Sequence, residues 1–256
     1  MIDLAGCSAI VTGGSGAIGG AVAERLVAAG AAVVLADVDA PRGVATAERI
    51  GASFVRTDVG LSGDLASAVA AATELGPLRF AFLNAGVSST EPFDATDDSL
   101  YRRAVSVNLD GVYWGVRATV PALRTAGGGA IVVTSSLAGL VPQPADPIYS
   151  ATKSAVIALV RALGPTLRDD GIRVNCVCPG FVDTPMVPAA VRDSGFPLLT
   201  TSDVADAVLA IAAMECDSQA FVLQPGRELS PYRFHGVPGA RAPGAESAVA
   251  PGAEWA

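Results

Sequence analysis

Lysine and histidine are almost absent from this sequence, which carries one of each, Lys153 and His235. Its 256 residues include 17 basic and 25 acidic side chains, for a net charge of -8 and an isoelectric point near 4.6. Nucleic-acid binding depends on clustered cations, so this balance argues against a DNA or RNA partner. One histidine cannot build a histidine-based metal site, and the four cysteines lack zinc-site spacing, so we expect no bound metal. Any chemical step that needs a lysine must use Lys153.

The sequence also lacks a hydrophobic run long enough to cross a membrane. Hydrophobic residues make up 51% of the chain, but no run approaches the ~20 residues that a spanning helix needs. The first residues carry no positive segment of the kind that begins a signal peptide. The cysteines do not have the spacing of a disulfide framework, which fits a reducing compartment; they are Cys7, Cys176, Cys178 and Cys216. We therefore expect a cytoplasmic protein without a membrane partner.

The sequence does contain a regular alternation of strand-like and helix-like segments. Short apolar runs predict seven strands, at residues 8–12, 32–37, 53–56, 80–83, 130–135, 173–177 and 220–223. Amphipathic patterns predict helices at residues 21–29, 44–50, 65–75, 96–123, 149–167 and 202–214. This alternation is typical of an α/β domain with a doubly wound, mainly parallel sheet and helices on both faces. We expect the domain at residues 1–226 and an irregular tail, rich in Pro, Gly and Ala, at residues 227–256.

A glycine-rich turn follows the first predicted strand and opens the first predicted helix. Its sequence is GGSGAIG at residues 13–19, and residues 14–19 satisfy the pattern G-x-G-x-x-G. Glycines let the backbone turn tightly and approach a pyrophosphate, which the amides and the positive dipole of the helix start can bind. The strand–turn–helix context favours this function over that of an ordinary turn. We expect a dinucleotide cofactor to contact Gly13, Ser15, Gly16, Ala17, Ile18 and Gly19.

Polar residues also end the next predicted strands, at the edge of the sheet where such folds bind ligands. Asp37 can accept hydrogen bonds from both hydroxyls of an adenosine ribose and would repel a 2′-phosphate. No Arg or Lys stands at Gly16 or Val38 to compensate, so the sequence favours NAD over NADP. The third and fourth strands end where an adenine ring and a nicotinamide ribose would lie, at Asp58, Val59, Asn84, Ala85 and Gly86.

Tyr149 and Lys153 stand four residues apart on a predicted helix, so they share one face, one turn from each other. A phenol has a pKa of about 10, and a neighbouring ammonium favours the phenolate. Bringing that pKa close to 7 takes roughly 4 kcal/mol, which a desolvated site can supply. An ordinary surface pair is a weaker explanation in a chain that otherwise uses arginine. We expect Tyr149 to exchange a proton with the substrate and Lys153 to hold ribose hydroxyls and relay the proton outward.

Two further polar residues complete the candidate centre. Ser136 ends the strand before the Tyr149 helix, where its hydroxyl can donate a hydrogen bond to a substrate oxygen. Asn108 lies inside the long predicted helix, where asparagine competes for backbone hydrogen bonds. There it can hold a local kink and a water that continues the relay from Lys153.

In this order along the chain, the residues resemble the short-chain dehydrogenase/reductase family, in its ordinary-length NAD(P)-binding branch. The resemblance covers roughly residues 4–226 and rests on the turn from Thr12 to Gly19, Asp58, Asn84-Ala85-Gly86, Asn108, Ser136, Tyr149-x-x-x-Lys153 and Pro179-Gly180-x-x-x-Thr184. It implies a single-domain Rossmann-type fold. It also implies hydride transfer between a nicotinamide cofactor and a secondary alcohol or ketone.

The resemblance implies a role for each site residue. Tyr149 would be the general acid/base, and Ser136 would polarise the substrate oxygen. Lys153 would lower the tyrosine pKa and bind the ribose, and Asn108 would complete the proton relay. The nicotinamide end would contact Pro179, Gly180, Val182 and Thr184. A homo-oligomer, a tetramer or a dimer, would form through the long helices near Asn108 and Tyr149.

The sequence departs from the family pattern at three places. Ala17 replaces the middle glycine of the turn, and Leu83 replaces the first Asn of the usual N-N-A-G. We expect a helix start to tolerate the Ala17 methyl group, with some loss of cofactor affinity, and the change at Leu83 to be harmless. After the last predicted strand the chain reads QPGR at residues 224–227 instead of ending in V-D-G-G, which alters any contact made there.

The segments expected around the substrate are largely apolar. Residues 137–148 contain no arginine, and Arg192 is the one base of the expected lid at residues 185–197. We therefore hypothesise a small-molecule substrate, an uncharged and largely apolar secondary alcohol or ketone. Alternatives are a 3-hydroxyacyl or 3-oxoacyl thioester oxidoreductase and, in a different class, a catalytically silent NAD-binding sensor or scaffold. Cys176 and Cys178 are expected to be core residues, and His235 stays without a role.

Overall fold

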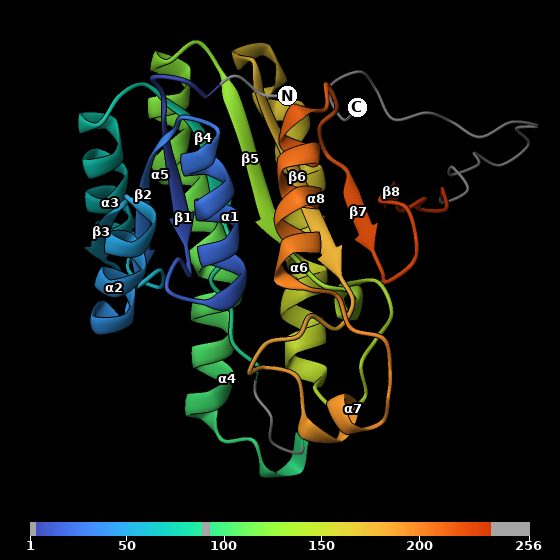
Figure 1. Ribbon diagram of the computed structural model, residues 1–256. Helices are drawn as coiled ribbons and strands as arrows, with labels where there is room; N and C mark the ends of the chain where they lie inside the picture. Colours follow the sequence, from blue (N-terminus) through green and yellow to red (C-terminus); the bar gives the residue numbers. More distant parts are fainter. Residues whose placement is uncertain (1–3, 89–92, 237–256) are drawn as a thin grey trace, which may run out of the picture.

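A single twisted sheet runs through the computed structural model, which describes residues 4–88 and 93–236 (Figure 1). The strand order is β3-β2-β1-β4-β5-β6-β7-β8, and every neighbouring pair is parallel except β7 and β8. The order reverses between β1 and β4, which makes the fold doubly wound, as predicted. The strands are β1 (Ser8–Thr12), β2 (Ala32–Asp37), β3 (Ser53–Arg56), β4 (Leu78–Leu83), β5 (Gly129–Thr134), β6 (Ile172–Pro179), β7 (Ala220–Leu223) and β8 (Ser230–Pro231).

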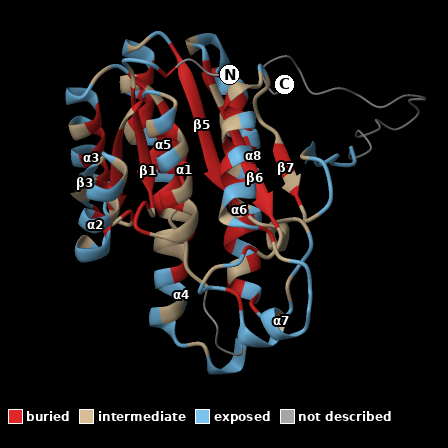
Figure 2. Cartoon of the chain, viewed as in Figure 1, coloured by how far each residue is buried: buried red, intermediate tan, exposed pale blue. Residues whose placement is uncertain are grey.

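Helices cover both faces of the sheet, and its central strands β1 and β5 are buried along their whole length (Figure 2). One core lies between the sheet and α1, α2 and α8, and a second lies between the sheet and α3, α5 and α6. Cys176 and Cys178 are buried in the second core, as expected from their alternation. The helices are α1 (Ala17–Ala28), α2 (Ala40–Ile50), α3 (Ser62–Glu74), α4 (Asp98–Val105), α5 (Gly111–Thr125), α6 (Pro147–Leu167), α7 (Ala189–Asp193) and α8 (Thr201–Ala213). Within the described ranges no helix is long and apolar enough to span a membrane.

The helix predicted at residues 96–123 is divided into two. A π-helical turn at Ser106–Asp110 separates α4 from α5 and contains Asn108 at its centre. The Asn108 side chain is fully buried and bonds the backbone of Val87, a contact from outside the helix. Where the sequence predicts a kink at Asn108, the structure has a wider, π-helical turn, a feature that often accompanies helix kinks.

The tail that the sequence predicts to be irregular is ordered at its start. Ser230–Pro231 forms β8, antiparallel to β7, and the Tyr232 N–H donates to the Ala220 carbonyl at 2.7 Å. The Arg161 guanidinium of α6 lies 3.8 Å from the ring centroid of Phe234. These long-range contacts add an eighth strand to the seven predicted ones. Residues 237–256 of the expected tail lie outside the described residues.

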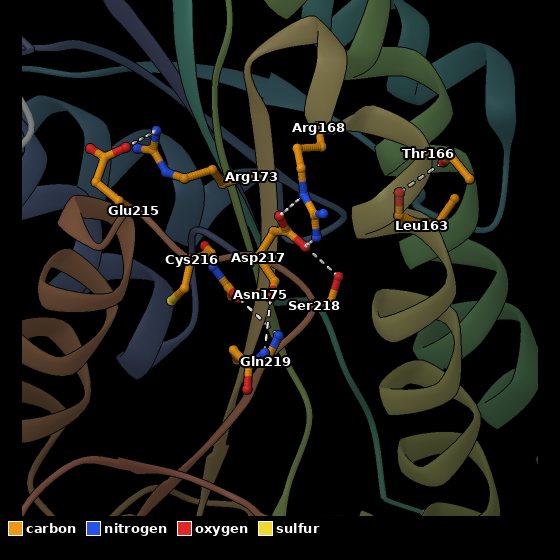
Figure 3. Close-up of polar contacts among 10 residues, drawn as sticks. All are labelled: Leu163, Thr166, Arg168, Arg173, Asn175, Glu215, Cys216, Asp217, Ser218 and Gln219. Atoms are coloured by element: carbon orange, nitrogen blue, oxygen red, sulfur yellow. Dashed lines mark hydrogen bonds and ion pairs between the residues drawn. The ribbon is translucent and has the colours of Figure 1, made fainter. Parts of the chain in front are cut away.

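A polar network holds the loop between α8 and β7, far from the carboxyl edge of the sheet (Figure 3). The buried Asn175 amide of β6 donates to the Cys216 carbonyl at 2.7 Å and accepts from the Gln219 N–H at 3.0 Å. Asp217 accepts two hydrogen bonds from Arg168 at 2.9 and 3.1 Å. These groups satisfy one another, so we assign them a structural role.

Candidate active site

The glycine turn connects β1 to α1 at the carboxyl edge of the sheet. Gly13 has φ +65, and a Cβ on Gly19 would lie 2.2 Å from the Gly13 carbonyl oxygen, so neither position accepts a side chain. The helix cap, Gly16, makes no side-chain hydrogen bond, which leaves the first-turn amides of α1 to bind an anion. Ala17 begins the helix, so its methyl group is tolerated there. The turn fits the pyrophosphate of a dinucleotide.

Asp37 ends β2 beside this turn. Its Oδ2 accepts a hydrogen bond from the Ser15 N–H at 3.0 Å, and its Oδ1 accepts one from the Asp39 N–H at 3.1 Å. The carboxylate thus lies against the glycine turn, where an adenosine ribose would follow the pyrophosphate. Asp58 is engaged in its own loop, where Oδ1 accepts from the Gly60 N–H at 3.0 Å, and Val59 is buried.

The loop after β4 runs between the glycine turn and the candidate catalytic residues. The Thr12 Oγ1 accepts hydrogen bonds from the N–H groups of Asn84 and Ala85 at 2.9 and 3.2 Å. A Cβ on Gly86 would lie 3.3 Å from the Lys153 Nζ and 3.4 Å from the Asn108 Oδ1. Gly86 therefore keeps the backbone close to both residues, as a ribose bound by Lys153 would require.

Lys153 is 2% exposed and projects from α6 towards the end of β5. Its Nζ donates to the Thr134 carbonyl at 2.8 Å and lies 5.6 Å from the centroid of the Tyr149 ring. Burial lowers the pKa of Lys153 to about 8, although the neighbouring Cys178 and Cys176 act in the opposite direction. The single lysine is therefore poised to lose its proton at mildly alkaline pH.

The side chains of Tyr149 and Ser136 lie close enough for Ser136 to act on the pKa of the phenol. Burial raises the pKa of Tyr149 above its ordinary value, the Ser136 hydrogen bond lowers it, and the charge of Asp146 raises it. This direction is opposite to the lowering expected from the spacing of Tyr149 and Lys153. The physical reason is that desolvation of the phenol dominates, while the Lys153 ammonium is bonded to Thr134.

Asn108 acts on the loop after β4 through its side chain. Its Oδ1 accepts from the Val87 N–H at 2.8 Å, and its Nδ2 donates to the Val87 carbonyl at 2.9 Å and to the Thr152 Oγ1 at 3.1 Å. Thr152 in turn donates to the Tyr149 carbonyl at 2.9 Å. The amide thus ties the loop to α6, and Asn108 lies close to Lys153 through Gly86.

The residues expected at the nicotinamide end follow β6. Pro179 ends that strand, and the Gly180 N–H donates to the Leu223 carbonyl of β7 at 2.9 Å. Val182 is buried and forms an isolated bridge with Leu199, which brings the expected lid back to the sheet. The Thr184 carbonyl accepts a hydrogen bond from Arg192, the one base of that lid.

The structure adds two residues to the site, Thr12, which the sequence indicates only as part of the glycine-turn motif, and Asp146. Thr12 directly precedes the glycine turn, so its place in the motif was a usable signal. Asp146 precedes Pro147 at the start of α6, and an Asp-Pro pair is a typical helix start. The pair indicates a cap but gives no sign of what else the carboxylate contacts.

A family model described as short chain dehydrogenase matches residues 8–195 of the chain. The chain belongs to this family. As a short-chain dehydrogenase, the protein is an NAD(P)-dependent oxidoreductase that acts on CH–OH groups. The carboxyl-edge arrangement of the glycine turn, the loop after β4 and the Tyr149 helix is that of its Rossmann-type fold.

Known short-chain dehydrogenases match the chain over most of its length. Cis-4-hydroxycyclohexanecarboxylate dehydrogenase of Sinomonas cyclohexanicum is 37% identical over 227 residues, 84% of this chain and 91% of the relative. A 2,5-dichloro-2,5-cyclohexadiene-1,4-diol dehydrogenase of Sphingobium indicum is 34% identical over 189 residues, 72% of this chain and 76% of the relative. The crystal structure of a 3-ketoacyl-(acyl-carrier-protein) reductase from Brucella melitensis, complexed with NADH, has a TM-score of 0.82 and 28% identity, covering 88% of this chain and 99% of that one.

Proposed function

We propose that the protein interconverts a secondary alcohol and a ketone with NAD, using Tyr149 as the general acid/base. The observation that carries this proposal is the contact of the Tyr149 phenol with Ser136, one helical turn from the buried Lys153. When bound, the nicotinamide accepts a hydride from the alcohol carbon or returns it to the ketone. The remaining chemistry belongs to the side chains.

In the oxidation direction, the Tyr149 phenolate takes the proton of the substrate hydroxyl. The Ser136 hydroxyl holds the same oxygen, which places it beside the phenol. Lys153 holds the ribose hydroxyls and passes the proton outward, and Asn108 continues that relay. Because burial raises the pKa of Tyr149, we expect the rate of oxidation to increase towards alkaline pH.

Replacing Tyr149 with phenylalanine tests the proposal. The substitution removes the hydroxyl that exchanges the proton but keeps the ring, so we expect turnover to fall at least ~10³-fold while NADH still binds. Turnover is followed by NADH absorbance with secondary alcohols as substrates, and binding by NADH fluorescence. Turnover by the variant at the rate of the unaltered protein would contradict the role of Tyr149. A protein that binds NADH but turns over none of the alcohols would favour the sensor or scaffold alternative.

The preference for NAD over NADP is supported by Asp37. The cofactor contacts that we propose are made by the glycine turn, by the strand-end residues and by the segment after β6: Gly13, Ser15, Gly16, Ala17, Ile18, Gly19, Asp37, Asp58, Val59, Asn84, Ala85, Gly86, Tyr149, Lys153, Pro179, Gly180, Val182 and Thr184. Among them, the carboxylate of Asp37 stands where a 2′-phosphate would meet a like charge.

Asp37→Ala tests this preference. The variant loses the ribose hydrogen bonds and the repulsion of a 2′-phosphate, so we expect KM for NAD to rise about tenfold and the NAD-to-NADP ratio of kcat/KM to fall. Asp39→Asn is the matched control, because Asp39 is exposed, lies two residues further on, and caps α2 through a hydrogen bond that asparagine can keep. An unchanged ratio in Asp37→Ala would show that another residue selects the cofactor.

For the substrate, we propose an uncharged, largely apolar secondary alcohol. The segments after β5 and β6 present exposed apolar side chains, Val141, Met186 and Phe196. The two named relatives act on ring alcohols, of which the diol is uncharged and the hydroxycyclohexanecarboxylate carries a charge. A panel of cyclohexanol, both 4-hydroxycyclohexanecarboxylate isomers and a 3-hydroxyacyl thioester separates the alternatives. Activity on the carboxylates alone would overturn an uncharged substrate. Activity on the thioester alone would favour the thioester alternative, which the match to the ketoacyl reductase structure supports.

The assembly and the compartment are also proposals. Exposed aromatic side chains on the long helices, Tyr101 on α4 and Tyr113 on α5, are consistent with a homo-oligomer, a tetramer or a dimer. The four cysteines are all unpaired, which is consistent with the reducing cytoplasm.

A further inference from the structure

The helix that carries Tyr149 and Lys153 begins at a buried carboxylate. Asp146 caps α6: its Oδ1 accepts a hydrogen bond from the Tyr149 N–H at 3.0 Å, and Pro147 occupies the first helical position. Asp146 is only 7% exposed, whereas a capping aspartate is ordinarily solvated. Burying a carboxylate is unfavourable unless it is hydrogen-bonded, so capping alone is a weak reason for a charge at this position.

The second oxygen of Asp146 reaches the loop after β4. Its Oδ2 accepts a hydrogen bond from the Ser88 Oγ at 2.7 Å. The same loop is held by Thr12 at Asn84 and Ala85, and by Asn108 at Val87. The bond to Asp146 joins Ser88 of this loop directly to the start of the Tyr149 helix.

The charge of Asp146 also acts on the Tyr149 phenol. Among the residues that the structure describes, the titratable groups that act on this phenol are Asp146 at the start of α6, Lys153 one turn further along α6, and Cys178 from β6. The carboxylate and Cys178 both raise the pKa of Tyr149, and the Ser136 hydrogen bond lowers it. Asp146 therefore opposes formation of the phenolate.

We propose that Asp146 is a positioning residue for Tyr149, fixing the first turn of its helix against the loop at residues 84–88 and holding a negative charge beside its phenol. This inference rests on the proposed function of Tyr149. A negative charge at this place favours the protonated phenol, and the hydrogen bond from Ser88 holds the carboxylate in a fixed direction. The acid/base group is thereby coupled to the loop expected at the nicotinamide ribose.

Three substitutions separate the effect of the Asp146 charge from the effect of its hydrogen bond to Ser88. Asp146→Asn keeps the cap, since asparagine caps helices as well as aspartate, and its amide can donate to the Ser88 hydroxyl, but the charge is lost. Ser88→Ala keeps the charge and the cap but loses this hydrogen bond. Asp146→Ala loses the charge, the hydrogen bond to Ser88 and the cap. Asp97→Asn is the matched control, because Asp97 caps α4 with the same contact to the third residue and is exposed.

The effect of the Asp146 charge on Tyr149 is measured first, by titrating the phenols in protein labelled with ¹³C at the tyrosine ζ carbon. The chain has four tyrosines, and the Tyr149 signal is the one missing from Tyr149→Phe. We expect Asp146→Asn and Asp146→Ala to move the Tyr149 titration down by about 1 pH unit, and Ser88→Ala and Asp97→Asn to leave it in place. A Tyr149 titration unchanged in Asp146→Asn would overturn the electrostatic part of the proposal.

The effect of the hydrogen bond between Ser88 and Asp146 is measured by NADH binding and by kinetics on the alcohol of the panel that gives the highest activity. We expect Ser88→Ala and Asp146→Ala to weaken NADH binding about threefold or more and to lower kcat about tenfold, and Asp146→Asn to change both less. Normal binding and kcat in the first two variants would overturn the positioning part. Full activity of Tyr149→Phe, in contrast, would remove the proposed function and leave the measured titrations valid.

Discussion

Lys153 shows how burial changes the ionisation of a single residue. Its pKa of about 8 lies below its ordinary value of 10.5, so between these pH values the unfolded chain binds a proton that the folded chain does not. Stability therefore rises as pH increases through this interval. Below pH 8 the ammonium is charged in both states, and its burial costs about 3 kcal/mol, an order of magnitude obtained from the size of the pKa difference.

Lys153→Met should therefore stabilise the protein while it abolishes turnover. Methionine fills the same space without a charge, so we expect a Tm about 5 °C higher at pH 7 and a gain that shrinks towards pH 10. Thermal unfolding at both pH values measures this. The control is Arg117→Met, which removes an exposed cation and should show no such dependence on pH. A Tm that falls in Lys153→Met at pH 7 would show that the Thr134 hydrogen bond outweighs desolvation.

At the scale of elements, the glycine turn depends on backbone contact. In Gly19→Ala the new Cβ would meet the Gly13 carbonyl oxygen at 2.2 Å, so the turn must move away from α1. We expect a loss of about 2 kcal/mol or more of unfolding free energy and at least tenfold weaker NADH binding. Urea unfolding and NADH fluorescence measure the two effects.

Gly63→Ala is the matched control for this substitution. Gly63 lies in the first turn of α3, and its added Cβ would meet nothing within 4 Å. Alanine is the better helix former, so this variant should gain about 0.5 to 1 kcal/mol. Equal effects of the two substitutions would mean that helix propensity, and not the close approach of Gly13, decides the outcome at Gly19.

Local patterns predicted the elements that local interactions determine. Strand β1 at Ser8–Thr12 has the predicted bounds, because a short apolar run buried on both faces is read directly from the sequence. The features that the sequence patterns did not predict depend on long-range contacts. The π turn at Asn108 is held by Val87, and the Ser88 partner of Asp146 lies 58 residues away along the chain. The direction of the Tyr149 pKa shift depends on burial, and the spacing of Tyr149 and Lys153 in the sequence gives no information about burial.

At the scale of the whole molecule, the catalytic domain that we expected at residues 1–226 is completed by the ten residues after it, which cover one edge of the sheet. Strand β8 pairs with β7, and Arg161 packs on Phe234, so the segment joins the last parallel strand to α6. An uncovered strand edge exposes unpaired backbone groups and invites association with other chains. We therefore propose that the folded domain extends at least to Gly236.

Shortening the chain tests this boundary. A chain that ends at Gly226 loses the β8 pairing and the Arg161–Phe234 contact, together about 2 kcal/mol, so its Tm should fall by about 4 to 8 °C relative to one that ends at Gly236. It should also aggregate at lower concentration, because the β7 edge is open. Thermal unfolding and light scattering compare the two chains, and Phe234→Ala in the longer one isolates the aromatic contact. Equal Tm values for the two lengths would return the boundary to residue 226 and reduce β8 to an incidental contact.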